Sequence, residues 1–145
     1  MYKLIIFDFD QCIDELVFRD FGKLLFSELQ KDYKIALASY NFNSKKILER
    51  KDLSDFLSII IASYHPSQCF PSGSIVFGSK KEMVEEILAK LEIHANEAIF
   101  FDDQIQNCQS VESLGVRSIL FDPKDTLDLK YLHRYINSPF YTIPV

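Results

Sequence analysis

Two carboxylates lie next to each other at the end of an apolar run near the start of the chain. Residues 3–14 read KLIIFDFDQCID, so a single phenylalanine separates Asp8 from Asp10. If the strand persists to Asp10, both acids project from one face, because strand side chains alternate with period two. Like charges this close oppose each other's ionisation unless a cation, a shared proton or hydrogen bonds compensate. Three interpretations stay open: a divalent metal held by oxygen ligands, a nucleophilic carboxylate beside an acid or base, and two solvated acids.

The elements that must position these acids alternate along the chain. Five near-continuous apolar runs are typical of strands buried on both faces of a parallel sheet. Helix patterns lie between them, and the clearest one follows Ser79 with Glu82 three residues later, a capping-box signature. The alternation predicts an α/β fold, a doubly wound three-layer sandwich with a five-stranded parallel sheet. The expected strands are 2–9, 34–39, 57–62, 98–101 and 116–121, and the expected helices are 20–30, 44–51, 80–91, 105–114 and 126–137.

Polar side chains follow the strand ends, which is where ligands bind in a doubly wound sheet. Lys80 and Lys81 open the helix after the third strand, an unfavourable place for cations because the helix dipole is positive there. Such departures from local preference concentrate at functional sites, so we expect Lys80 in the site and Lys81 in solvent. Phosphoryl transfer needs a nucleophile, cations, hydrogen-bond donors and a proton shuttle. Besides Lys80, the strand ends offer Asp8, Asp10, Ser39, Tyr40, Asn41, Asp102 and Asp103 for these tasks.

Four segments, in this order, resemble the motifs of the haloacid-dehalogenase (HAD) superfamily of phosphatases. They read LIIFDFD, IALAS, GSKKEM and FFDDQIQN, and the last two are most similar to the small magnesium-dependent phosphatases that lack a cap domain. The resemblance implies a HAD-like Rossmannoid fold without a cap. It also implies magnesium-dependent hydrolysis of a phosphomonoester through an aspartyl-phosphate intermediate.

The same resemblance implies roles for the acids. Asp8 would be the nucleophile and a Mg²⁺ ligand, and Asp10 would be the general acid and then base, binding the metal through its backbone carbonyl. Asp103 matches the family's metal-binding position, with Asp102 and Asn107 as supporting residues. An alternative for Asp102 and Asp103 is that one of them caps the following helix.

The residues expected to contact substrate come from two other motifs. By the resemblance, Ser39 would hold the transferring phosphoryl oxygens and Lys80 would balance charge beside them. Tyr40 and Asn41 directly follow Ser39, so we expect them to contact substrate as well.

Two departures from the family pattern motivate a different interpretation. The usual glycine and threonine after the first motif are Gln11 and Cys12 here, which removes a flexible residue and a hydroxyl donor. The alternative function is therefore a catalytically weakened phosphate-binding or regulatory module of the same fold. A phosphorelay receiver domain is a poorer match, because its phosphoacceptor ends the third strand, where this chain has Ala62 and Ser63. A glycosyltransferase with a DxD motif is also conceivable, but 145 residues is short for its two substrate sites.

Bulk properties limit the partners. The formal charge of -5 argues against nucleic acid, since phosphate-backbone affinity depends on Lys and Arg. No apolar run approaches bilayer length, so we expect no membrane association and a cytoplasmic location.

The three cysteines have no paired spacing, which suits a reducing compartment. His65 and Cys69 have no further ligands nearby, so a zinc site is not expected. We expect a monomer or a weak dimer.

The length bounds the organisation and the access to the site. We expect one domain over residues 1–145, with room for a short flap after the first strand but for no cap domain. An open site suits a phosphorylated substrate of macromolecular or flexible kind, a phosphoprotein or else a small phosphate ester. The connection over residues 64–78 is long, and its Tyr64, Phe70 and Phe77 either form an aromatic wall beside the phosphate or hold the loop on the core.

Overall fold

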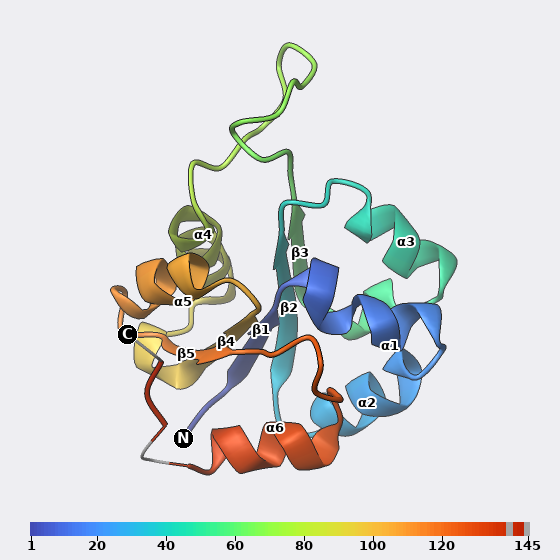
Figure 1. Cartoon of the computed structure of the whole chain (residues 1–145), viewed down its shortest axis with the longest axis vertical. Coiled ribbons are helices and arrows are strands. Elements are labelled where there is room, and N and C mark those ends of the chain that lie inside the picture. Colours follow the sequence, from blue (N-terminus) through green and yellow to red (C-terminus); the bar gives the residue numbers. More distant parts are fainter. Residues whose placement is uncertain (139–140, 144–145) are drawn as a thin grey trace.

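A five-stranded parallel sheet forms the centre of the molecule (Figure 1). The computed structural model describes residues 1–138 and 141–143. The strand order is β3-β2-β1-β4-β5, so β1 lies in the middle and pairs with β2 on one side and β4 on the other. The predicted fold class and strand number are confirmed. The strands are β1 (Leu4–Phe7), β2 (Lys34–Ser39), β3 (Ile59–Ala62), β4 (Ala98–Asp102) and β5 (Arg117–Leu120).

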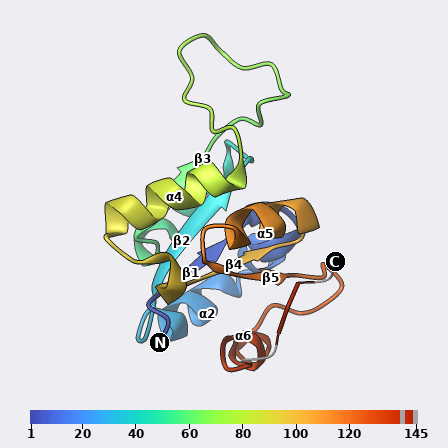
Figure 2. The same cartoon turned by 90° about the vertical axis from the view of Figure 1, so that its left-hand side faces the viewer.

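Helices cover both faces of the sheet, as Figures 1 and 2 show. Successive residues of β1 point to opposite faces, so Ile5 and Phe7 pack into one core while Leu4 and Ile6 pack into the other. The first core is closed by α1 (Asp14–Phe18), α2 (Gly22–Leu29), α3 (Ser44–Arg50) and α6 (Leu129–Ile136). The second core is closed by α4 (Lys80–Leu91) and α5 (Ile105–Glu112).

Several element boundaries differ from the predicted ones for identifiable reasons. β1 ends at Phe7 rather than at residue 9, because the chain leaves the sheet there and makes a tight turn over Phe9–Ile13, in which Gln11 is left-handed. α6 begins at Leu129 rather than at residue 126, because the Asp128 side chain accepts a hydrogen bond from Tyr131 N and caps the helix there. The predicted helix 20–30 is preceded by a further short helix, α1.

The described residues contain no cap domain. The short turn segment Phe9–Ile13, α1 and α2 lie between β1 and β2, and residues 63–79 between β3 and α4 form a loop without helix or strand. This loop rises above the carboxyl ends of the strands (Figures 1 and 2). Within the described part of the chain, no helix has the length and apolar character needed to cross a bilayer. The assignment of residues 1–145 to one domain stays a prediction.

Candidate active site

A cavity of about 380 Å³ opens at the carboxyl ends of the central strands. It brings together side chains that follow β1, β2 and β4 with the first residue of α4. Six of the predicted site residues line it: Asp8, Asp10, Tyr40, Lys80, Asp103 and Asn107. The convergence expected from the strand ends is therefore present in the structure.

Lys80 is the centre of the charged network. Its side chain is only 1% exposed, and its Nζ donates to Asp8 Oδ1 at 2.7 Å, to Ala38 O at 2.7 Å and to Asp102 Oδ2 at 3.0 Å. Nζ also lies 5.7 Å from the centres of the Tyr40 and Phe100 rings. An ammonium has three protons, so these acceptors occupy all of them.

The capped start of α4 fixes the backbone position of Lys80. Ser79 is the N-cap, and its side chain accepts from Glu82 N at 3.2 Å, as the capping-box pattern predicts. The Glu82 carboxylate reaches one residue further back and accepts from Gly78 N at 2.7 Å. Lys81, in contrast, is half-buried and forms no salt bridge within the described residues.

Burial of the charged groups shifts the pKa values at the site. Burial raises the pKa of Asp8 from 3.8 to about 7, while Lys80 opposes this rise and Asp102 adds to it. The pKa of Lys80 is raised as well, because the attraction of Asp8 and Asp102 outweighs the cost of burying its charge. Lys80 is therefore a fixed cation rather than a proton donor near neutral pH.

The turn after β1 positions Asp10 and departs from ordinary backbone geometry. Asp10 is extended (φ -64, ψ 134) and Gln11 is left-handed, with φ 58. The alternation of an unbroken strand therefore does not apply, and the turn itself brings Asp10 to the cavity. Asp10 Oδ1 accepts from Asn41 Nδ2 at 3.1 Å, so Asn41, which does not itself line the cavity, reaches the site through Asp10.

Ser39 ends β2 and is almost fully buried. Its hydroxyl oxygen accepts from Asn41 N at 2.9 Å, which leaves the hydroxyl proton able to donate. Tyr40 follows it on the cavity wall, where burial raises the pKa of the phenol. Tyr40 therefore lies on the same cavity wall as Asp8, whereas Ser39, buried behind Asn41 N, is not among the residues that line the cavity.

The two acids after β4 have different surroundings. Asp102 is fully buried; its Oδ1 accepts from Gln104 N at 2.8 Å, and its Oδ2 accepts from Lys80 and from Asn107 Nδ2 at 3.2 Å. Asp103 is half-buried and lines the cavity, and burial followed by the charge of Asp102 raises its pKa. Neither caps α5, whose N-cap is Gln104, so the alternative of a helix cap is wrong.

The donor set fits a hard divalent cation. Asp8, Asp102 and Asp103 each offer one carboxylate oxygen, and these oxygens lie within 4.8 Å of one another. Among the described residues, the ammonium of Lys80 alone is bonded to this group, and it contacts two of the three acids. Oxygen ligands with uncompensated negative charge are those that Mg²⁺ and Ca²⁺ take in proteins.

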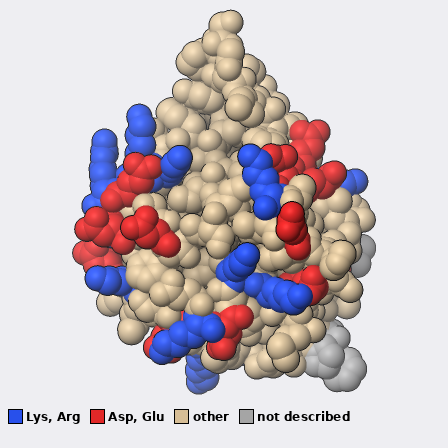
Figure 3. Space-filling view, turned by 180° about the vertical axis from the view of Figure 1, so that it is seen from behind, with Lys and Arg blue, Asp and Glu red and all other residues tan. Residues whose placement is uncertain are grey.

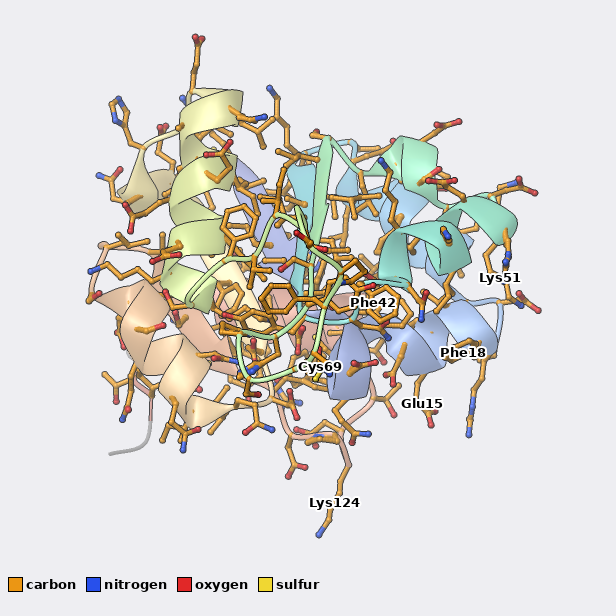
Figure 4. All side chains as sticks on the ribbon, turned by 90° about the horizontal axis from the view of Figure 1, so that it is seen from above. Glu15, Phe18, Phe42, Lys51, Cys69 and Lys124 are labelled. Atoms are coloured by element: carbon orange, nitrogen blue, oxygen red, sulfur yellow. The ribbon has the colours of Figure 1, made fainter. Side chains whose placement is uncertain are left out.

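Some residues at the cavity were not predicted to contact substrate. Gln104 and Gln106 line it and lie within the motif FFDDQIQN, which gave them no role, whereas His65 lies outside all four motifs. Of the long loop, Tyr64 stacks on Phe42 with ring centres 4.2 Å apart, and Phe77 packs against the second core. In the view from above, Phe42 lies beside the loop that carries Cys69 (Figure 4). Tyr64, Phe70 and Phe77 do not line the cavity, so the structure favours their role in holding the loop.

The family model described as acid phosphatase matches residues 15–134, a range that begins after Asp8 and Asp10. No curated protein sequence gives a significant match.

Solved structures share the fold at low identity. The phosphatase domain in the N-terminal part of a Bacteroides fragilis protein, solved with magnesium, has a TM-score of 0.66 and 19% identity, covering 92% of this chain and 39% of that one. The core domain of a candidate phosphoglycolate phosphatase from Streptococcus pneumoniae has a TM-score of 0.65 and 13% identity, covering 95% and 97%. A HAD family enzyme from Bacteroides thetaiotaomicron, solved with magnesium and inorganic phosphate, has a TM-score of 0.58 and 16% identity, covering 91% and 99%.

Proposed function

Because the chain belongs to the acid phosphatase family and is a phosphatase of the HAD superfamily, we propose that it hydrolyses phosphomonoesters through an aspartyl-phosphate on Asp8. The observation that carries this proposal is the buried Lys80, whose ammonium bonds to both Asp8 and Asp102 at the carboxyl ends of the central strands. A fixed cation beside a buried carboxylate that borders the cavity is the arrangement that a nucleophile needs when its target is an anion.

Asp8 is the nucleophile of the proposed reaction. Its carboxylate attacks phosphorus, the bond from phosphorus to the ester oxygen breaks, and the leaving oxygen takes a proton. Lys80 keeps Asp8 oriented through the 2.7 Å contact to Oδ1 and favours its ionised form. The same lysine offsets part of the charge that accumulates when a phosphate dianion enters.

Asp10 is the acid and then the base. It is exposed at the cavity, and its contact with Asn41 fixes the direction of the carboxyl group. As an acid it donates the proton to the leaving oxygen, and as a base it accepts a proton from the water that hydrolyses the aspartyl-phosphate. The hydroxyl of Ser39 binds the oxygens of the transferring phosphoryl group. The side chains of Tyr40 and Asn41 contact the substrate.

We assign the cation to Mg²⁺, held by Asp8, Asp103 and the backbone carbonyl of Asp10. Asp102 is the supporting acid, because Gln104, Asn107 and Lys80 already donate to its two oxygens. When bound, the cation neutralises charge on the phosphoryl oxygens. The magnesium found with two of the similar structures supports this choice.

The substrate class that we favour is a phosphorylated protein segment. No cap covers the cavity within the described residues, and the loop 63–79 beside it contains no Lys, Arg, Asp or Glu. On the face that Figure 3 draws, the top of the molecule bears no charged side chains. An uncharged surface suits a polypeptide next to its phosphate, whereas nucleic acid brings further phosphates that need cations.

The test is a hydrolysis panel with and without magnesium. We expect release of phosphate from an aryl phosphate and, with higher kcat/KM, from phosphopeptides, and little release from 3'-phosphorylated oligonucleotides. Asp8→Asn removes activity while keeping the shape of the side chain, and Asp103→Ala removes the response to magnesium. Full activity in excess chelator contradicts the metal assignment, and equal rates on free small esters contradict the substrate class.

One observation favours the second candidate, a weakened phosphate-binding module. Gln11 has the left-handed φ of 58 that suits glycine, and the buried Cys12 lies 3.9 Å from Phe101 O instead of facing the cavity. The nucleophile loop is therefore stiffer than one with glycine and lacks a hydroxyl donor. Phosphate binding without turnover on any ester of the panel selects this candidate.

A further inference from the structure

One histidine outside the predicted motifs lies at the cavity. His65 lines the same cavity as Asp8, Asp10 and Lys80. It follows β3, whereas Asp103 follows β4, and β2 and β1 lie between those two strands. Along the strand order, His65 therefore approaches the site from the β3 side, whereas the proposed metal ligand Asp103 approaches it from the β4 side.

The ring of His65 is held in a defined orientation. Nδ1 lies 2.6 Å from Ser67 Oγ and accepts from Ser67 N at 3.1 Å, and the backbone N of His65 donates to Gln68 Oε1 at 3.0 Å. The ring also packs edge-on against Tyr40, with centres 4.7 Å apart. Tyr40 in turn lies under Nζ of Lys80. A side chain used only to hold the loop does not need to reach the cavity wall.

These contacts decide which ring nitrogen carries the proton. A backbone N–H can only donate, so Nδ1 is the acceptor and the proton of the neutral ring is on Nε2. Nε2–H is thus the donor that the ring has left for a ligand.

The cavity needs such a donor. Lys80 and His65 are the basic side chains that line it, and all three protons of Lys80 are already bonded to Asp8, Asp102 and Ala38 O. A phosphate dianion that enters therefore finds no free proton on the lysine. His65 is the remaining basic side chain at the wall.

We propose that His65 is a phosphate-binding residue, whose Nε2–H donates a hydrogen bond to a non-bridging oxygen of the substrate phosphoryl group. This inference rests on the proposed function, because it assumes that the phosphoryl group binds beside Asp8. Tyr40 and Ser67 are the positioning residues for the imidazole.

The experiment measures binding of inorganic phosphate to the full chain in the presence of magnesium by calorimetry, and kcat/KM for an aryl phosphate in parallel. His65→Ala removes the donor, whereas His65→Gln keeps an N–H near the position of Nε2. His133→Ala is the matched control, because His133 is exposed on α6 at the far end of the molecule from the loop (Figure 1). Melting temperatures of all variants show whether the fold is kept.

We expect His65→Ala to weaken phosphate binding by about ten-fold to a hundred-fold, the range for a hydrogen bond to a charged group, and His65→Gln to recover most of it. Unchanged binding in His65→Ala overturns the inference, as does a His65→Gln variant as weak as His65→Ala, since the ring then acts by packing on Tyr40. A wild-type chain that binds no phosphate overturns it too. A chain that binds phosphate in a His65-dependent way and hydrolyses no ester contradicts the proposed enzyme alone.

Discussion

Replacing Lys80 by methionine tests the electrostatic reasoning about the site most directly. The substitution keeps the length of the side chain but leaves Asp8, Asp102 and Ala38 O in a buried region without their shared donor. Removing one partner of a buried ion pair costs about 3–5 kcal/mol, because the other charge stays buried and uncompensated. We expect a loss of this size in the free energy of unfolding of the metal-free protein at about pH 8.

The same reasoning predicts how the loss depends on pH. Lys80 lowers the pKa of Asp8, so its removal raises that pKa further above the unfolded value of 3.8. A group whose pKa is raised in the folded state contributes stability below its unfolded pKa and loses it as pH rises through its folded pKa. The difference in the free energy of unfolding between Lys80→Met and wild type should therefore be small near pH 4 and large near pH 8. The pH at which this difference appears is set to within about one unit.

Urea unfolding followed by circular dichroism at both pH values measures the effect. Lys81→Met is the matched control, because Lys81 is the next residue on α4 and forms no salt bridge within the described residues; its change should stay within about 0.5 kcal/mol. A Lys80→Met protein within about 1 kcal/mol of wild type at both pH values would falsify the view that this cation stabilises the acidic cluster.

Three further predictions concern the same site. In metal-free protein, the raised pKa of Asp8, about 7, means that its stabilising contribution is lost as pH rises through 7, so magnesium should raise the melting temperature more at about pH 8 than at about pH 5; equal shifts contradict a metal bound by Asp8. Gln11 has a left-handed φ of 58, so Gln11→Val should lower the free energy of unfolding by about 1–2 kcal/mol more than Gln11→Gly does, measured in urea; similar values for both variants would show that this turn is not strained. Asn41→Ala removes the 3.1 Å bond to Asp10 and should lower kcat for an aryl phosphate about ten-fold with little change in phosphate binding, and a change in binding alone would place Asn41 on the substrate instead.

Much of the fold was predictable because the local pattern and the global fold agree. The expected strands and helices are present, with the bounds of β2 matching the prediction at both ends. Strands buried on both faces must be apolar throughout, so each one is visible as a short continuous run. The less accurate boundaries occur where a side-chain cap or a turn replaces regular backbone, as at Asp128 and after Phe7.

The candidate site was predictable in its membership but not in its contacts. Asp8, Asp103 and Lys80 come from three segments that the strand-end rule brings to one edge of the sheet. The separate environments of Asp102 and Asp103 were not predictable from two adjacent identical residues, since they depend on the turn at Gln104 and on the reach of Asn107. Neither was the position of His65, because a loop without regular structure has no period from which to infer where its side chains point.

The sequence by itself determined which residue types stand at the ends of which strands, and in what order along the chain. Burial on both faces of a sheet and the dipole of a helix end constrain residue types over a few positions, so both can be recognised in the local sequence pattern. Only the tertiary structure decided that one ammonium joins carboxylates 72 and 22 residues away, and that a histidine packs against Tyr40 at the same cavity. Those contacts depend on how whole elements pack, because the energies that select them arise between segments that are distant in the chain.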